Sequence, residues 1–161
     1  MKNFFKLFNI EEKFNIDLTD LESKYLNFQN LHHPDKTSNK SLKKSLDFNE
    51  GYQVLNDDFL RACHLLQLQD IDILNDEKAL KPDKSMLMEI LELQEHVEQI
   101  TQKNAIEIFQ KNLKNTITDL INDFNHYYTH QEYKVAGQFL VKAKYLKKTL
   151  ADLKIKKQKL L

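Results

Sequence analysis

Apolar residues recur at steps of three and four along most of the chain, which is the spacing of amphipathic helices. In the N-terminal part this spacing predicts a helix that begins after Asp17, its expected N-cap. The helix should end near His32–His33, because Pro34 disfavours the helical conformation of the residue before it. The apolar face of this helix consists of Leu18, Leu21, Tyr25 and Phe28.

A second N-terminal helix follows a polar loop over residues 34–41. Its expected apolar face carries Phe48, Gly51, Tyr52 and Leu55. Two helices joined by a short polar loop pack as an antiparallel hairpin. The sequence Asn56-Asp57-Asp58 then predicts a break and a new helix cap, followed by a helix over residues 59–68.

An acidic stretch from Asp70 to Pro82 precedes three longer helical patterns, at about residues 84–102, 104–128 and 131–159. Their short connections favour an up-down-up three-helix bundle. We therefore predict an all-α fold with a domain over residues 1–74, a linker over 75–82 and a second domain over 83–161. The expected core stripes are Met86, Ile90, Leu93, Val97 and Ile100 on the first of these helices, and Val135, Phe139, Ala143, Leu146, Leu150 and Leu153 on the last.

Two leucines of the first C-terminal helix fall outside its core stripe. At about 100° per residue, Leu87 and Leu91 lie one turn apart and away from the stripe. Glu95 continues their line, and Met88 and Glu92 lie beside it. On the last helix, Tyr145 lies off the stripe above Val141. These leucines either widen the core, pack on the N-terminal domain or anchor a partner-binding patch.

Composition removes several classes of function. Lys+Arg 24 balance Asp+Glu 24, so no net charge attracts the chain to nucleic acid or to a membrane surface. With Gly 2 and Pro 2, a β-rich fold and a glycine-rich phosphate loop are both disfavoured. Cys63 is the one cysteine, which excludes an intrachain disulfide and a Cys-x-x-Cys metal site; we expect it to pack as a small apolar residue. No apolar run is long enough to span a membrane.

The charges are unevenly distributed along the C-terminal part. Residues 142–161 contain eight Lys and one Asp, whereas residues 83–99 contain five acidic residues and one Lys. This pattern favours complementary pairing between neighbouring helices, with a patch that faces a partner as the alternative.

Histidines raise one alternative from another functional class. His126 and His130 are four residues apart, a spacing that places two imidazoles on one helix face. Together with His33 and Asp35 they would be the candidates in a metal-binding or hydrolytic helical protein. No Cys, Asp or Glu completes a recognisable motif beside the pair, so we expect no native metal site.

Four N-terminal motifs follow one another in a specific order and spacing. The opening Phe4-Phe5-x-Leu7-Phe8 is followed by the Tyr25/Phe28 helix, by His33-Pro34-Asp35 at the hairpin turn and by Asn49-x-Gly51-Tyr52-x-x-Leu55. Over about residues 1–70 this arrangement resembles the J-domain of DnaJ-type co-chaperones. The resemblance implies that His33, Pro34 and Asp35 contact a DnaK-class chaperone and stimulate its ATP hydrolysis, with Lys24 and His32 as the nearby basic residues.

Two features depart from the usual J-domain. The helix before the turn is only weakly basic, with Lys24 and His32 and the neutral Gln29 and Asn30 between them, which favours a dedicated chaperone partner. Gly51 stands where the family commonly has Ala, and a glycine within a helix costs about 1 kcal/mol relative to alanine.

The C-terminal part narrows the resemblance. Arg61-Ala62-x-x-Leu65-Leu66 and Leu87-Met88-Glu89-x-Leu91-Glu92-Leu93-x-Glu95 resemble the HscB family of iron–sulfur co-chaperones over nearly the whole chain. The family resemblance implies an IscU-type scaffold protein and an HscA-type chaperone as partners. The residues implied in scaffold binding are Leu87, Met88, Leu91, Glu92, Glu95 and Tyr145, the last in place of the usual Phe.

The expected activity is therefore that of a co-chaperone in the bacterial cytoplasm. We expect no catalytic residue, no cofactor, no metal and no nucleic-acid or membrane partner. A small J-protein that serves a different client is the alternative within the same class.

Overall fold

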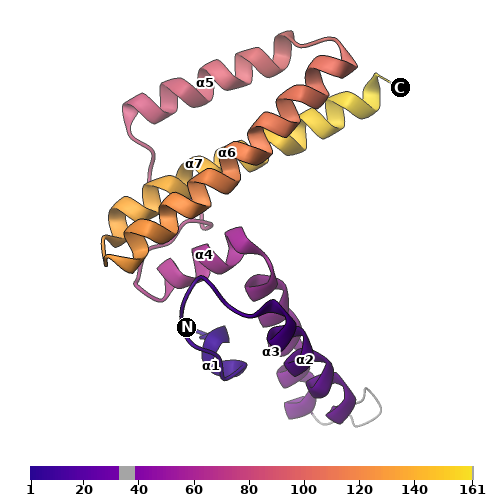
Figure 1. Cartoon of the computed structure of the whole chain (residues 1–161), viewed down its shortest axis with the longest axis vertical. Coiled ribbons are helices and arrows are strands. Elements are labelled where there is room, and N and C mark those ends of the chain that lie inside the picture. Colours follow the sequence, from indigo (N-terminus) through magenta and orange to yellow (C-terminus); the bar gives the residue numbers. More distant parts are fainter. Residues whose placement is uncertain (33–38, 161) are drawn as a thin grey trace. The chain divides into compact units, whose positions relative to one another are not determined.

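A computed structural model describes residues 1–32 and 39–160 (Figure 1). Within these residues the regular secondary structure is helical, which confirms the all-α prediction. The helices are α1 (Phe4–Leu7), α2 (Leu18–Leu31), α3 (Asn39–Asn56), α4 (Asp58–Gln67), α5 (Lys84–Gln99), α6 (Lys103–Thr129) and α7 (Tyr133–Lys159). None of the described helices is both long and apolar enough to cross a membrane.

Contacts between residues divide the chain into two units, Met1–Gln69 and Asp70–Leu161. The segment over 75–82, which the sequence suggests as a linker, belongs to the second unit in this division. Each unit is built around its own helices, and each is described separately below.

Aspartate side chains cap the helices where the sequence predicts a start. Asp17 Oδ1 accepts hydrogen bonds from the backbone N–H groups of Thr19 at 3.0 Å and Asp20 at 3.1 Å. Asp57 Oδ1 accepts from the N–H of Leu60 at 2.8 Å, at the start of α4. Each bond satisfies a backbone N–H that lacks a partner within its own helix. The predicted cap at Asp17 and the predicted break at residues 56–58 are both confirmed.

An aromatic cluster holds α2 against α3 in the N-terminal unit. The rings of Tyr25 and Tyr52 stack with their centroids 4.2 Å apart, and Tyr25 Oη donates a 2.6 Å hydrogen bond to Asn49 Oδ1. The rings of Phe28 and Phe48 stack at 3.7 Å. Stacked aromatic pairs add stabilisation beyond the area that they bury. The residues that carry the J-domain resemblance therefore join the two helices of the hairpin.

Gly51 lies where α1 packs on α3. A Cβ atom at this position would lie 2.8 Å from Cδ1 of Phe4 and 3.0 Å from Cε2 of Phe8. The absence of a side chain thus lets two buried rings approach the backbone of α3. This close approach explains the glycine and offsets its helix-propensity cost.

Arg61 is a buried structural residue. Its Nε and Nη1 donate 2.7 Å hydrogen bonds to the carbonyl oxygens of Phe14 and Leu55, and Nη2 pairs with Asp58 Oδ1 at 2.7 Å. The guanidinium carbon also lies 4.6 Å from the centroid of the Phe14 ring. A buried charge is tolerated when its donors are paired in this way. Arg61 therefore ties the segment before α2 to the junction of α3 and α4.

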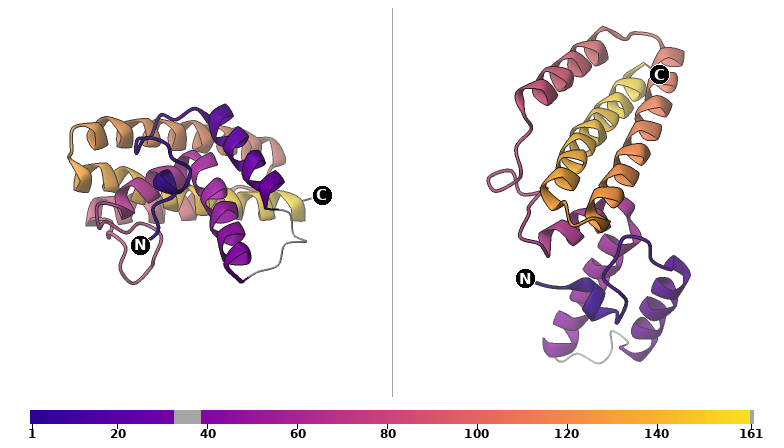
Figure 2. Two further views of the ribbon diagram at one scale, coloured as in Figure 1. Left: turned by 90° about the horizontal axis from the view of Figure 1, so that it is seen from below. Right: turned by 60° about the vertical axis from the view of Figure 1, so that its left-hand side comes forward.

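In the C-terminal unit, α6 and α7 form a long antiparallel pair and α5 packs against α7 (Figures 1 and 2). The buried side chains of the pair include Ile106, Leu113, Ile117, Leu120 and Phe124 of α6 and Ala136, Leu140, Ala143, Leu146 and Leu153 of α7. On α5, Ile90 is buried, as its place in the predicted stripe requires, and Ile100 at the end of the helix is buried with it.

Two positions of α7 differ from the predicted core. Val135 is 44% exposed, because the buried stripe of the first turns runs through Ala136 and Leu140, one residue further along the helix. Val141, placed off the core by periodicity, is buried. The reason is that residues before α5 pack on this side of α7, so that α7 is covered on a second face.

Opposite charges pair between neighbouring C-terminal helices. Lys142 Nζ lies 2.8 Å from a carboxylate oxygen of Glu89, and Lys157 Nζ lies 3.0 Å from Glu107. Lys156 Nζ donates to the carbonyl oxygens of Val97 and Glu98 at the end of α5. Lys142 and Glu89 join the two segments of opposite charge, so the interpretation of the charge pattern as complementary pairing between helices is confirmed for this pair.

Candidate partner-binding site

One face of α5 exposes large apolar side chains. Leu87 is 44% exposed, Met88 53% and Leu91 54%, whereas Ile90 of the same helix is 6% exposed. The helix is fixed at its start by Asp83, whose Oδ1 accepts from the N–H of Met86 at 2.8 Å. These leucines are therefore not part of the core. Leu87, Met88 and Leu91 are referred to below as the α5 patch.

Acidic side chains border the α5 patch. Glu92 and Glu95 are exposed on the same helix. Glu89 forms an ion pair with Lys142 of α7. The carboxylates of Glu92 and Glu95 therefore supply the negative charge beside the α5 patch. An apolar centre with a polar rim is the usual composition of a protein-binding surface.

Tyr145 is half-buried on α7, the helix against which α5 packs. It lines a pocket of about 250 Å³ together with Asp76, Ala79, Leu80, Lys81, Pro82, Val141 and Lys144. Val141 and Ala79 are buried, so they form the apolar floor. The expected scaffold-binding residues thus lie on two helices that pack together, with the patch on α5 and Tyr145 on α7.

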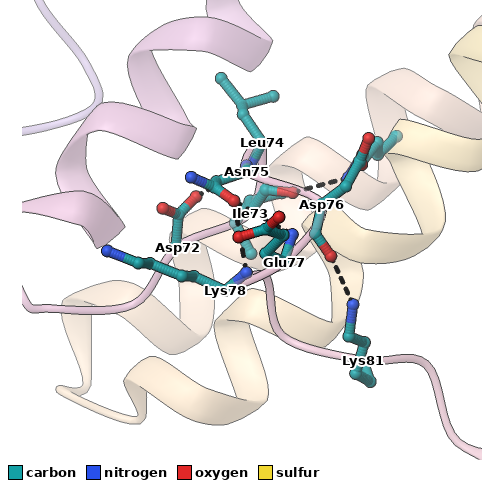
Figure 3. Close-up of polar contacts among 9 residues, drawn as sticks. Asp72, Ile73, Leu74, Asn75, Asp76, Glu77, Lys78 and Lys81 are labelled. Atoms are coloured by element: carbon teal, nitrogen blue, oxygen red, sulfur yellow. Dashed lines mark hydrogen bonds and ion pairs between the residues drawn. The ribbon is translucent and has the colours of Figure 1, made fainter.

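The residues before α5 form a folded strap on α7 (Figure 3). Lys144 Nζ donates hydrogen bonds to the carbonyl oxygen of Ile73 at 3.0 Å and to Asp76 Oδ1 at 3.1 Å. Lys81 Nζ donates to the carbonyl oxygen of Asp76 at 2.6 Å. The N–H of Leu80 donates to the carbonyl oxygen of Asp72 at 2.9 Å, which closes the loop. Residues 72–81 are called the strap below.

The strap is a feature that sequence reasoning missed. Ile73 is 2% exposed and Ala79 is 8% exposed, so the strap carries buried apolar side chains. The signal available in the sequence was the pair of isoleucines, Ile71 and Ile73, within an otherwise acidic stretch.

The expected chaperone-binding residues fall partly outside the described chain. His33, Pro34 and Asp35 lie among residues 33–38, which the structure does not describe. Lys24 is engaged within the N-terminal unit, because its Nζ pairs with Asp20 at 3.2 Å and donates to the carbonyl oxygen of Asn9 at 3.1 Å. His32 follows the last turn of α2 and stacks on Phe28 with ring centroids 4.5 Å apart.

His64 is a buried titratable group of the N-terminal unit. Its Nε2 accepts a 3.1 Å hydrogen bond from the backbone N–H of Phe4, and its Nδ1 lies 3.3 Å from Gln67 Oε1. An Nε2 that accepts is unprotonated, so Nδ1 carries the proton of a neutral ring. Burial lowers the pKa of His64 below its ordinary value and outweighs the opposing effects of Gln67, Glu12 and Glu50.

His126, His130 and Cys63 lie apart from the α5 patch along the chain. The rings of His126 and His130 lie with centroids 4.7 Å apart, and His130 Nδ1 lies 2.7 Å from the carbonyl oxygen of His126. Within residues 1–32 and 39–160, no group of three or more His, Cys, Asp or Glu side chains is placed to hold a metal ion. Cys63 is buried, as a small apolar residue would be.

The family model and the curated relatives that this chain matches all carry the name HscB. Residues 82–154 match the family described as the HSCB C-terminal oligomerisation domain. A co-chaperone protein HscB homolog from Acinetobacter baumannii is 29% identical over 153 residues, covering 94% of this chain and 88% of the relative. A second such homolog, from Haemophilus ducreyi, is 28% identical and covers 100% of this chain and 99% of the relative.

Solved structures share the fold over nearly the full length. The chaperone HscB from Vibrio cholerae superposes with a TM-score of 0.83 at 25% identity, covering 99% of this chain and 100% of that chain. The human co-chaperone protein HscB gives a TM-score of 0.85 at 24% identity, covering 98% of this chain and 83% of that chain.

Proposed function

The chain belongs to the HscB family of co-chaperones, and from this premise we propose that it acts in iron–sulfur cluster biogenesis. In this proposal the C-terminal unit binds an IscU-type scaffold protein, and the N-terminal unit presents that scaffold to an HscA-type chaperone. The protein is not itself an enzyme, since the ATP that is hydrolysed is bound by the chaperone. We place it in the bacterial cytoplasm, in line with its relatives from Acinetobacter and Haemophilus.

The observation that carries the scaffold-binding proposal is the α5 patch. Three large apolar side chains are exposed on α5, the helix that buries Ile90, and exposed carboxylates lie beside them. Truncating an apolar anchor at the centre of an interface costs about 1–4 kcal/mol of binding free energy. Leu87, Met88 and Leu91 are the proposed anchors, Glu92 and Glu95 the polar rim, and Tyr145 an aromatic anchor on α7.

The chaperone-stimulating role is assigned to His33, Pro34 and Asp35, with Lys24 and His32 beside them. This assignment rests on the J-domain resemblance and on the family to which the chain belongs. The aromatic cluster of α2 and α3 supports it, because Tyr25, Phe28 and Tyr52, which carry the J-domain resemblance, also join these two helices. The internal engagement of Lys24 leaves little free positive charge on α2, which favours a dedicated chaperone over a general one.

A pull-down with purified components tests the proposal. Immobilised parent protein should retain an IscU-type scaffold and an HscA-type chaperone from a mixture, and Leu91→Ala should lose the scaffold while it retains the chaperone. Recovery of neither partner by the parent would refute the proposed function.

Self-association is the second candidate for the same surface, because the matched domain is described as an oligomerisation domain. Light scattering at increasing protein concentration decides between the two. A dimer that disappears in Leu91→Ala would assign the α5 patch to contacts between copies of the chain.

A further inference from the structure

We infer that the pocket beside Tyr145 binds a carboxylate side chain, Asp or Glu, of the same partner protein that covers the α5 patch. This inference rests on the proposed function, since it specifies how that partner is recognised. It assigns a binding role to Lys81 and Lys144, for which neither the sequence patterns nor the family resemblance gave a role.

The size of the pocket suits a single side chain. Its volume of about 250 Å³ is below the range of about 300–1,000 Å³ that is typical of small-molecule sites. Its floor is apolar, with buried Val141 and Ala79, while Leu80, Pro82 and Tyr145 add apolar surface to its lining. A side chain with an aliphatic stem and a polar end therefore fits this lining.

The polar groups of the pocket favour a negative charge. Two ammonium groups, of Lys81 and Lys144, line it with one carboxylate, that of Asp76. Lys144 pairs with that carboxylate, which is itself 93% exposed, whereas among the described residues Lys81 Nζ donates to a backbone carbonyl and pairs with no carboxylate. The charge of Lys81 is therefore not balanced by a carboxylate in the pocket. A partner carboxylate would supply the missing negative charge through a charge-assisted hydrogen bond.

Tyr145 contributes a further donor. In the described part of the chain its hydroxyl group makes no hydrogen bond, whereas its backbone carbonyl accepts from Thr149. The hydroxyl at the pocket can donate to the same carboxylate as Lys81. This gives a physical role to the hydroxyl group, which a phenylalanine at position 145 would lack.

The strap fixes the geometry of the pocket. Lys144 holds the strap on α7 through its bonds to Ile73 and Asp76, so it acts as a positioning residue as well as a charge. Pro82 and Asp83 lead directly from the strap into α5. The strap side of the pocket and the α5 patch thus belong to one continuous stretch of chain, and α7 completes the pocket with Val141, Lys144 and Tyr145. The partner meets negative charge at Glu92 and Glu95 and positive charge at the pocket, which sets its orientation.

Calorimetric titration with the IscU-type scaffold tests the inference on the full chain. Lys81→Met should weaken binding about tenfold, and Tyr145→Phe about fivefold, because each removes one hydrogen bond to the carboxylate. The matched control is Lys78→Met, which removes the same charge from the same strap. Lys78 does not line the pocket, and its side chain points away from Lys81 (Figure 3). This control should change binding less than twofold.

A scan of the scaffold identifies the carboxylate. One Asp→Asn or Glu→Gln variant of the scaffold should bind the parent protein more weakly than the unchanged scaffold does. The same scaffold variant should bind the Lys81→Met protein with the affinity that it has for the parent protein. Equal effects of Lys81→Met and Lys78→Met, or no coupled acidic residue on the scaffold, would overturn the inference. Leu91→Ala separates this result from failure of the proposed function. If Leu91→Ala binds the scaffold as tightly as the parent protein does, or if the parent protein does not bind the scaffold, the proposed function fails and the inference fails with it.

Discussion

The backbone N–H of Phe4 donates a hydrogen bond to Nε2 of His64 across 3.1 Å, and the two rings lie with centroids 4.8 Å apart. This contact joins α1 to α4 and exists only while Nε2 is unprotonated. The lowered pKa of His64 shows the same preference of the folded state for the neutral ring.

The stability of the N-terminal unit should therefore depend on pH through His64. In the unfolded chain a histidine titrates near pH 6.5, whereas in the folded chain it titrates at lower pH. The contribution of His64 is thus present above about pH 6.5 and is lost as pH falls from there toward the folded pKa. Chemical denaturation of the parent and of His64→Gln at several pH values measures it. The difference in unfolding free energy between them should shrink below about pH 6.5; parallel curves from pH 8 to 5 would contradict this role.

Gly51→Ala should destabilise the protein although alanine is the better helix former. The added methyl group would lie 2.8 Å from the ring of Phe4, and overpacking a core costs about 1–3 kcal/mol. The gain in helix propensity is about 1 kcal/mol, so we expect a net loss of about 1 kcal/mol. For a unit of this size that loss lowers the melting temperature by about 4–8 °C.

The control for Gly51→Ala is a double variant. In a Phe4→Leu background the nearer of the two rings that meet the methyl group is absent, so the substitution should cost less than in the parent. A loss of the same size in both backgrounds would show that the Phe4 ring is not the cause.

Much of the N-terminal unit could be predicted from the sequence, because the contacts that set its helix boundaries join residues close together in the chain. The start of α2 depends on Asp17 and the start of α4 on Asp57, which lie beside the N–H groups that they cap. The hairpin follows from the apolar spacing of α2 and α3. The role of Arg61 was not predictable, because two of its acceptors are backbone carbonyls, of Phe14 and Leu55, which any residue could supply.

The C-terminal surface was predicted in part. Periodicity separated Leu87 and Leu91 from Ile90, and the exposure of the two leucines agrees with that separation. Periodicity failed at Val141 because a helix pattern carries no information about a segment that docks from elsewhere in the chain. The strap reaches α7 through Lys144, a contact between residues about seventy positions apart. The pocket beside Tyr145 depends on this contact and so was missed.

Substitutions at exposed and buried positions of α5 should separate binding from folding. Leu87→Ala and Leu91→Ala should each weaken binding of the scaffold at least about tenfold, as loss of an interface anchor does. Because both side chains are exposed, melting should move by only a few degrees. Ile90→Ala is the matched control, since truncation of a buried aliphatic side chain costs about 2–5 kcal/mol. If all three variants melt alike, the α5 patch is not a free surface.

Tyr145→Ala should also weaken scaffold binding about tenfold or more, because it removes both the ring and the hydroxyl from the pocket. The ring is half-buried, so a moderate loss of stability accompanies this change. Titration at a temperature well below the melting point of the variant separates the two effects. Unchanged affinity for the scaffold would exclude Tyr145 from the interface.

Single-turnover ATP hydrolysis by an HscA-type chaperone, with the scaffold present, tests the central claim most directly. The parent protein should accelerate hydrolysis, and His33→Gln should give the rate of the chaperone and scaffold alone while it binds the scaffold as tightly as the parent. His130→Gln, which changes an exposed histidine of the other unit, should stimulate like the parent. Stimulation by His33→Gln equal to that of the parent would contradict the account.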